Sequence, residues 1–135
     1  MPEDHYINFK DFSVEERFGE TIADGKWGIV PFALYKYQKN LGLTNSEVWF
    51  LCWVIMHKWG EEDSFPSLSA LARYSGRTRT YMQKITRDLV EKGYIVKRER
   101  RLDNGATASN YYDISPLIER LEKEIEALPV LEGDE

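Results

Sequence analysis

The stretch "TNSEVWFLCWVIMHKW", residues 44–59, constrains the fold more than any other part of the chain. Thr44 followed three residues later by Glu47 is a capping box, in which each side chain satisfies a backbone N–H that the helix start leaves unpaired. We therefore expect a helix that begins at Thr44 and runs to the end of this stretch. Every residue from Val48 to Met56 is apolar. Such a helix must be covered on several sides, by its own domain, by a second subunit or by both.

Length and composition allow one domain with a sizeable core. The chain has 135 residues, of which 42% are hydrophobic, and a domain of this size buries roughly two thirds of its unfolded surface. The single cysteine, Cys52, lies within the apolar run, which favours a buried thiol and excludes an intrachain disulfide. The N-terminus lacks the pattern of a signal peptide, and the apolar run is too short for the roughly 20 residues of a membrane span. We expect a soluble, cytoplasmic protein with no membrane partner.

Two short helices are predicted after the apolar one. Ser67 is the expected N-cap of the first, which Gly76 ends, and Thr78 is the expected N-cap of the second, which Gly93 ends. Apolar residues at three-and-four spacing give each helix an inward face. These inward positions are Leu68, Leu71, Ala72, Met82, Ile85 and Leu89.

A β-hairpin and a final helix follow. Residues 94–102 are typical of a strand, residues 103–109 of a turn that contains Asn-Gly, and residues 110–114 of a return strand. Ser115 and Pro116 begin the last helix. Its apolar residues recur at 3, 4, 3 spacing and are candidates for a homodimer contact, although the stripe could also pack on its own domain. They are Ile118, Leu121, Ile125 and Leu128.

The predicted fold class is mostly α with a small β-hairpin, an α+β arrangement. Residues 1–21 show no sustained period and form an N-terminal arm of uncertain order. Residues 22–114 form the main domain, which opens with a turn or short strand and one or two helical turns. Residues 115–135 form the C-terminal helix and an acidic tail.

Charge is distributed unevenly along the chain. The formal net charge is −5, yet residues 73–101 contain ten Lys or Arg against three Asp or Glu. Residues 1–30 contain seven acids against three bases, and residues 113–135 contain eight against two. A basic helix face is usually just a solvated surface. Whether this segment binds nucleic acid therefore has to be judged from its position in the fold. The acidic ends favour solubility.

The order of elements, with its motifs, resembles the winged helix-turn-helix DNA-binding proteins. It is most similar to the branch found in plasmid and phage replication proteins and small regulators, over residues 44–114. The matching motifs are F-P-S at 65–67, L-A followed by the turn glycine Gly76, L-x-x-x-G-Y-I at 89–95, and S-N-x-Y-x-I at 109–114. Arg77 departs from the pattern, because an apolar turn residue is common there.

The resemblance implies that residues 79–92 are a recognition helix whose N-terminal half enters the DNA major groove, and that the hairpin is the wing. The helix residues it assigns to DNA are Thr78, Arg79, Thr80, Gln83, Lys84 and Arg87, and the wing residues are Arg98, Arg100, Arg101 and Asn104. The implied function is sequence-specific binding of double-stranded DNA without catalysis. The protein would mark a replication origin or an operator, as a homodimer or with replication or transcription proteins.

One other functional class competes with this one. A winged-helix module that docks proteins without binding DNA would keep the same core. An enzyme is not expected, because the chain shows no metal-ligand spacing and no phosphate-binding glycine loop, and we expect no cofactor. The tryptophans Trp49, Trp53 and Trp59 are expected in the core or a dimer surface. A platform for stacking bases should alternate aromatic with basic residues.

Overall fold

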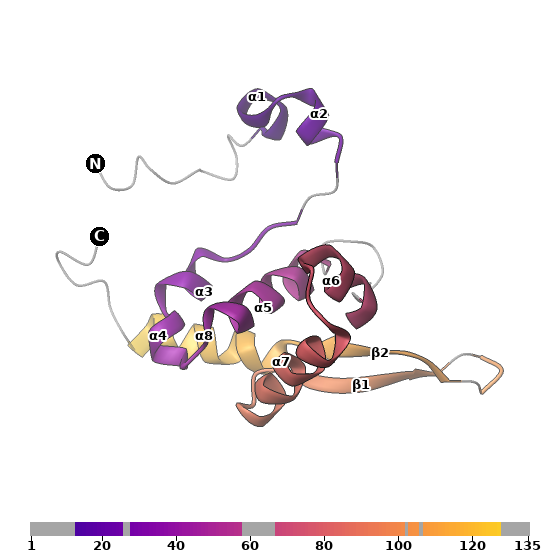
Figure 1. Cartoon of the computed structure of the whole chain (residues 1–135). Helices are drawn as coiled ribbons and strands as arrows, with labels where there is room; N and C mark the ends of the chain where they lie inside the picture. The colour runs from indigo at the N-terminus through magenta and orange to yellow at the C-terminus, as the bar shows by residue number, and fades with distance from the viewer. Residues whose placement is uncertain (1–12, 26–27, 58–66, 102, 106, 128–135) are drawn as a thin grey trace. The chain divides into compact units, whose positions relative to one another are not determined.

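A computed structural model describes most of the chain (Figure 1). The described residues are 13–25, 28–57, 67–101, 103–105 and 107–127. Contacts divide the chain into two compact units, residues 1–27 with 130–135 and residues 28–129. In the first unit the described helices are α1 (Val14–Phe18) and α2 (Glu20–Ala23). Ser13 caps α1 by accepting a hydrogen bond from the Glu16 backbone N–H at 3.3 Å.

The second unit has the fold of a winged helix-turn-helix with an additional C-terminal helix. The order of its elements is α3 (Phe32–Lys36), α4 (Gln38–Leu41), α5 (Asn45–His57), α6 (Leu68–Ser75), α7 (Arg79–Glu91), β1 (Val96–Arg101), β2 (Thr107–Asp113) and α8 (Ser115–Ala127). In Figure 1 the antiparallel hairpin β1–β2 projects from the helices of this unit, and α8 contacts α3. The predicted class, mostly helical with a small hairpin, is confirmed.

The capping box that opens α5 is present. The Thr44 backbone N–H donates to Glu47 Oε1 at 2.8 Å, and the Glu47 backbone N–H donates to Thr44 Oγ1 at 3.1 Å. Phe50 and Leu51 are fully buried, so α5 is the central helix of the core. Trp49, however, is 40% exposed, so the domain does not cover this helix on every side. The predicted end of the helix near residue 59 lies outside the described residues.

The helix-turn-helix forms as its capping residues predict. Ser67 Oγ accepts from the Ala70 N–H and Thr78 Oγ1 from the Tyr81 N–H, while Gly76 adopts φ +70 between the two helices. The predicted inward residues are buried, apart from Leu68, which is half-buried against the core. Thr86 is also buried, and its hydroxyl donates to the Met82 carbonyl at 2.9 Å. A polar residue can occupy this inner position because that bond satisfies its hydroxyl within the helix.

The hairpin is longer on its return side than the sequence predicts. β2 begins at Thr107, because Thr107 and Ala108, expected in the turn, pair with Arg101 and Arg100. The register shifts between Arg98 and Arg100, which marks a β-bulge in the wing.

The last helix, α8, belongs to the same compact unit as the hairpin. Leu117 is fully buried and Leu121 is 4% exposed, both within the core. Of the four predicted dimer residues, Ile118 and Ile125 are exposed, whereas Leu121 packs inward and is not available to a second subunit in this structure. Leu128 lies outside the described residues.

Candidate nucleic-acid interface

Helix α7 presents one polar, basic face to solvent. Met82, Ile85 and Leu89 anchor its inner side, so the positions between them point outward. The residues of this helix assigned from the sequence are all exposed: Arg79, Thr80, Gln83, Lys84 and Arg87. The only acids of this helix, Asp88 and Glu91, lie in its C-terminal part. The first turns of α7 therefore carry exposed basic and polar side chains and no acidic one.

Two residues at the start of α7 also act within the helix-turn-helix. Arg79 Nη1 donates to Ser69 Oγ on α6 at 3.0 Å. The hydroxyl of Thr78 accepts the Tyr81 N–H at 3.1 Å. Arg79 is thus directed toward α6 in this structure. The sequence did not identify Ser69 as its partner. A serine two residues after an N-cap carries no signal of such a contact.

The wing arginines are placed differently from one another. Arg98 Nε donates to Asp113 Oδ2 at 2.9 Å, an ion pair between β1 and β2. The Arg98 side chain is 49% exposed, so its other donors still reach solvent. The backbones of Arg100 and Arg101 lie in β1 beyond the bulge, and Asn104 lies exposed in the connecting turn.

Asp113 connects the wing to the start of α8. Its Oδ1 accepts the Ser115 hydroxyl at 2.6 Å and the Ser115 backbone N–H at 2.9 Å. These two bonds and the Arg98 guanidinium lower the pKa of the Asp113 carboxyl to about 2. Asp113 was not predicted as a functional residue, although an aspartate two positions before Ser115 is itself a capping signal.

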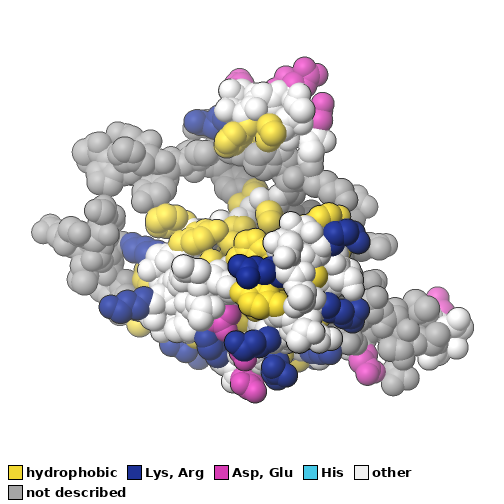
Figure 2. Space-filling view, in the orientation of Figure 1, with side chains coloured by type: hydrophobic (Ala, Val, Ile, Leu, Met, Phe, Trp, Pro, Cys, Tyr) yellow, Lys and Arg dark blue, Asp and Glu magenta, His cyan; other side chains and the backbone are white. Residues whose placement is uncertain are grey.

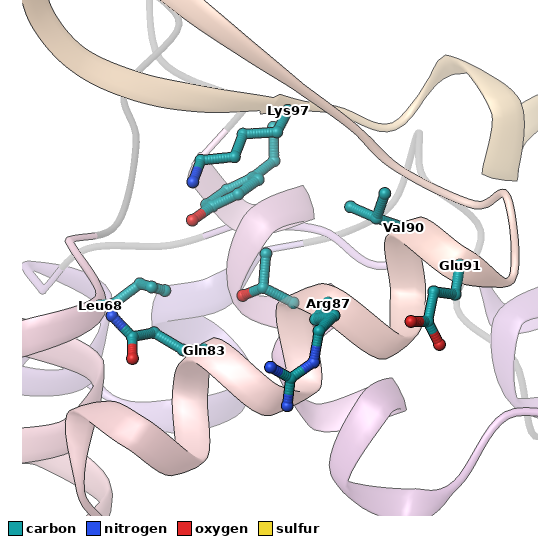
Figure 3. Close-up of a pocket in the computed structure, with 8 residues that line it drawn as sticks. Leu68, Gln83, Arg87, Val90, Glu91 and Lys97 are labelled. Atoms are coloured by element: carbon teal, nitrogen blue, oxygen red, sulfur yellow. The ribbon is translucent and has the colours of Figure 1, made fainter.

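A hollow of about 290 Å³ separates α7 from the wing. In Figure 3, Gln83, Arg87 and Glu91 follow one another along α7, Lys97 stands opposite them on β1, and Leu68 lies at one side. The structure therefore brings two predicted residues, Gln83 and Arg87, together with Lys97. Lys97 was not among the predicted wing residues. Neighbouring residues of a strand face opposite sides, so strand alternation would have placed Lys97 and Arg98 on different faces of the wing.

The C-terminal end of α7 is tied to the start of α5. Lys92 Nζ lies 2.6 Å from Glu47 Oε1 and donates to the Gly42 carbonyl at 2.8 Å. Burial alone would raise the pKa of the Glu47 carboxyl, but the bonds from Lys92 and Thr44 outweigh it, and the pKa is lowered. This ion pair links the end of α7, the helix that carries the basic face, to the central helix.

Within the described ranges, no group of three His, Cys, Asp or Glu residues is arranged to hold a metal ion. None of the helices in that part of the chain is long and apolar enough to cross a membrane.

The model of the family described as the DnaD N-terminal domain matches residues 30–128, which is most of the chain and includes the whole winged helix-turn-helix. No curated protein matches the chain.

Proposed function

The chain belongs to the DnaD N-terminal domain family, a replication-related, winged-helix-like domain, and on this basis we propose that it binds double-stranded DNA without catalysing a reaction. The first turns of α7 would lie in the major groove and the wing on the neighbouring backbone. Bound in this way, the protein marks a replication origin or an operator of plasmid or phage type and excludes or recruits other replication or transcription proteins.

The observation that supports the proposal is the exposed face of α7. Arg and Lys side chains can bond guanine O6 and N7, and a Gln side chain can bond adenine N6 and N7. Gln83, Lys84 and Arg87 are all exposed and lie within two turns of one another. The helix start at Thr78 offers backbone N–H groups to a phosphate. We therefore assign recognition of the DNA sequence mainly to Gln83 and Lys84. Arg79 can also contact a base if its hydrogen bond to Ser69 is broken on binding.

The wing and α8 supply the rest of the proposed complex. Arg98, Arg100 and Arg101 would contact phosphates or the narrower minor groove, which adds affinity without adding sequence preference. One helix-turn-helix reads a half-site, so a homodimer would read two. Ile118 and Ile125 are the exposed apolar residues of α8 that can meet a second copy.

Selection of binding sites from random duplexes, followed by fluorescence anisotropy across a salt series, tests the proposal. The double change Gln83→Ala and Lys84→Ala removes two side chains that can bond base edges. It should reduce discrimination between selected and random duplexes by about 1–3 kcal/mol for each bidentate pairing it abolishes. Arg98→Ala should weaken all duplexes alike and reduce the salt slope by about 1. Lys39→Ala, which removes an exposed lysine from α4, is the matched control and should change neither.

Two results would defeat the proposal. One is the absence of salt-dependent binding to any duplex, and the other is an unchanged preference in the double variant. A palindromic selected site would support the dimer, and a single half-site would count against it.

A second candidate function is a protein-docking module that uses the same face. The hollow between α7 and the wing favours it, because Leu68 and Tyr112 line it and Val90 beside them is 42% exposed. Val90→Ser should then weaken capture of a replication protein by this domain, whereas Lys84→Ala should not. If the domain binds no duplex and Val90→Ser has this effect, docking replaces DNA binding as its function.

A further inference from the structure

A second hollow, of about 590 Å³, lies between α5 and the turn that joins α6 to α7. Aromatic rings line it, from Trp49 and Trp53 on α5, Tyr74 on α6 and Tyr81 on α7. On the face shown in Figure 2, hydrophobic side chains gather over α5 and beside α6, with Lys and Arg side chains among them. We call this hollow the aromatic groove. It is not used by the duplex-binding face proposed above.

The rings of the aromatic groove are held in place but remain accessible. The centroids of Trp53 and Tyr74 are 5.6 Å apart with an interplanar angle of 40°. The hydroxyl of Tyr81 lies 2.7 Å from Ser46 Oγ, which fixes its ring. Tyr74 is nevertheless 65% exposed and Trp49 is 40% exposed. A set of preformed, solvent-facing aromatic surfaces is what a planar ligand requires.

Two arginines lie over the tyrosine rings of the groove. The Arg73 guanidinium lies 5.3 Å from the Tyr74 ring centroid, and that of Arg77 lies 5.2 Å from the Tyr81 centroid. No Asp or Glu is among the described residues that line the groove. Along the sequence the tryptophans do not alternate with basic residues, which disfavoured base stacking. In the fold Arg77, from the turn, lines the groove together with both tryptophans, and Arg73, from α6, lies over the Tyr74 ring at its edge.

We propose that the aromatic groove binds a segment of single-stranded DNA. Bases stack on the exposed rings of Trp49 and Tyr74, and Arg73 and Arg77 contact the phosphates that flank them. Stacking tolerates any base, because every base has a π-face, and the backbone supplies a negative charge at each nucleotide for the arginines. A duplex cannot enter in this way, because its base faces are already stacked on one another.

The proposal places two nucleic-acid sites next to each other along the chain. Arg77 directly precedes Thr78, the cap of α7, and Tyr81 of α7 also lines the groove, so the groove adjoins the first turn of the duplex-binding helix. A domain built in this way can hold duplex and single strand together. Such a substrate exists wherever a duplex has been opened, which suits a replication-related domain.

The test uses the full chain and a fluorescent oligo(dT) of about 10 nucleotides, a length within the range that single-strand sites occupy. Trp49→Ala and Tyr74→Ala should each weaken oligo(dT) binding about tenfold, the effect expected from losing one stacked base. Tyr35→Ala is the matched control, because Tyr35 is 53% exposed on α3 and does not line the groove. Arg77→Gln should reduce the salt slope by about 0.7. Binding should also quench tryptophan fluorescence in the wild type.

The outcomes separate this proposal from the duplex proposal. The double change Gln83→Ala and Lys84→Ala should leave oligo(dT) binding intact, and Tyr74→Ala should leave duplex preference intact. Failure of duplex binding alone therefore refutes only the earlier proposal. Circular dichroism shows whether each variant folds. Tyr74 is largely exposed, so Tyr74→Ala should fold and keep the test valid even if Trp49→Ala does not.

Three results would overturn the single-strand site. The first is a wild type that does not bind oligo(dT) in about 50 mM salt, where such electrostatic contacts are strong. The second is that both groove variants bind it as well as Tyr35→Ala does. The third is that Trp49→Ala and Tyr74→Ala dissociate a homodimer in sedimentation, or abolish capture of a proline-rich peptide, with oligo(dT) affinity unchanged. In that case the groove is a protein interface.

Discussion

Replacing Lys92 by methionine tests whether the ion pair with Glu47 holds α7 on the central helix. Lys92 Nζ lies 2.6 Å from Glu47 Oε1, and the Glu47 side chain is 4% exposed against 35% for Lys92. Methionine keeps an unbranched apolar stem of similar length but removes the charge. The Glu47 carboxylate then remains buried, with the Thr44 backbone N–H at 2.8 Å as its remaining donor.

The expected loss of stability follows from that geometry. Breaking a buried ion pair by removing one partner costs about 3–5 kcal/mol, because the other charge is left uncompensated. Here the capping bond from Thr44 persists and the Lys92 side of the pair is open to water, which lowers the cost. We expect Lys92→Met to reduce the free energy of unfolding by about 2–3 kcal/mol at pH 7. For a domain of this size the melting temperature should fall by about 5–15 °C.

The pH dependence gives the sharper test. In the wild type the folded pKa of Glu47 is lowered, so its stabilising contribution is present above the unfolded pKa and is lost as pH falls through the folded value. Without Lys92, burial is opposed by fewer bonds, so the folded pKa of Glu47 is higher than in the wild type. Protonation then relieves the buried charge. The deficit of the variant should therefore be largest near pH 7 and shrink as pH falls toward about 4.

Urea unfolding monitored by circular dichroism at several pH values measures this deficit. Lys84→Met, on the exposed face of the same helix, is the control and should cost less than about 0.5 kcal/mol. The double variant Glu47→Gln with Lys92→Met should recover part of the loss. A deficit that does not change with pH, or one no larger than that of the control, would refute the reasoning.

Three further predictions concern the frame around the interface. Gly28→Ala should destabilise the domain by about 1–3 kcal/mol in urea unfolding, because a Cβ there would lie 2.5 Å from the Met56 Cα and the backbone must shift. Asp113→Ala should lower the free energy of unfolding by about 1 kcal/mol at pH 7. Since the folded pKa of Asp113 is depressed to about 2, that difference should disappear as pH falls from about 4 toward 2, which acid titration of both proteins would reveal. Leu121→Ala should lower the free energy of unfolding by about 2–5 kcal/mol, measured by thermal unfolding, because it leaves a cavity in the core. Ile125→Ser should leave stability nearly unchanged, and it should weaken self-association in sedimentation only if α8 pairs in a dimer.

Local signals predicted most of the fold. The caps Thr44, Ser67 and Thr78 and the turn residue Gly76 act through hydrogen bonds and backbone angles that involve only near neighbours, so they could be read directly. The helix α1 could have been predicted in the same way, because Ser13 and Glu16 carry the S-x-x-E pattern of a capping box. The early start of β2 could not, because Thr107 joins the strand only through its partner on β1.

The candidate interface was predicted unevenly for the same reason. The exposed face of α7 follows from helix periodicity once Met82 and Ile85 are known to be buried. The hydrogen-bond partners of these side chains lie on other elements, as Ser69 of α6 does for Arg79. Such contacts leave no periodic signal in the sequence. The register shift before Arg100 puts two residues of β2 opposite one of β1, so the partners of Arg100 and Arg101 depend on how the two strands pair.

Helix boundaries, inward faces and the concentration of basic residues on α7 and β1 could be read from the amino-acid order alone, because each depends on residues a few positions apart. Which charges meet and which aromatics remain open was settled by the folded chain. Lys92 and Glu47 are far apart along the chain, and Arg77 reaches the aromatic groove from a turn rather than from α5. Such contacts depend on how helices pack, and side-chain spacing within one element carries no information about the element that will pack against it.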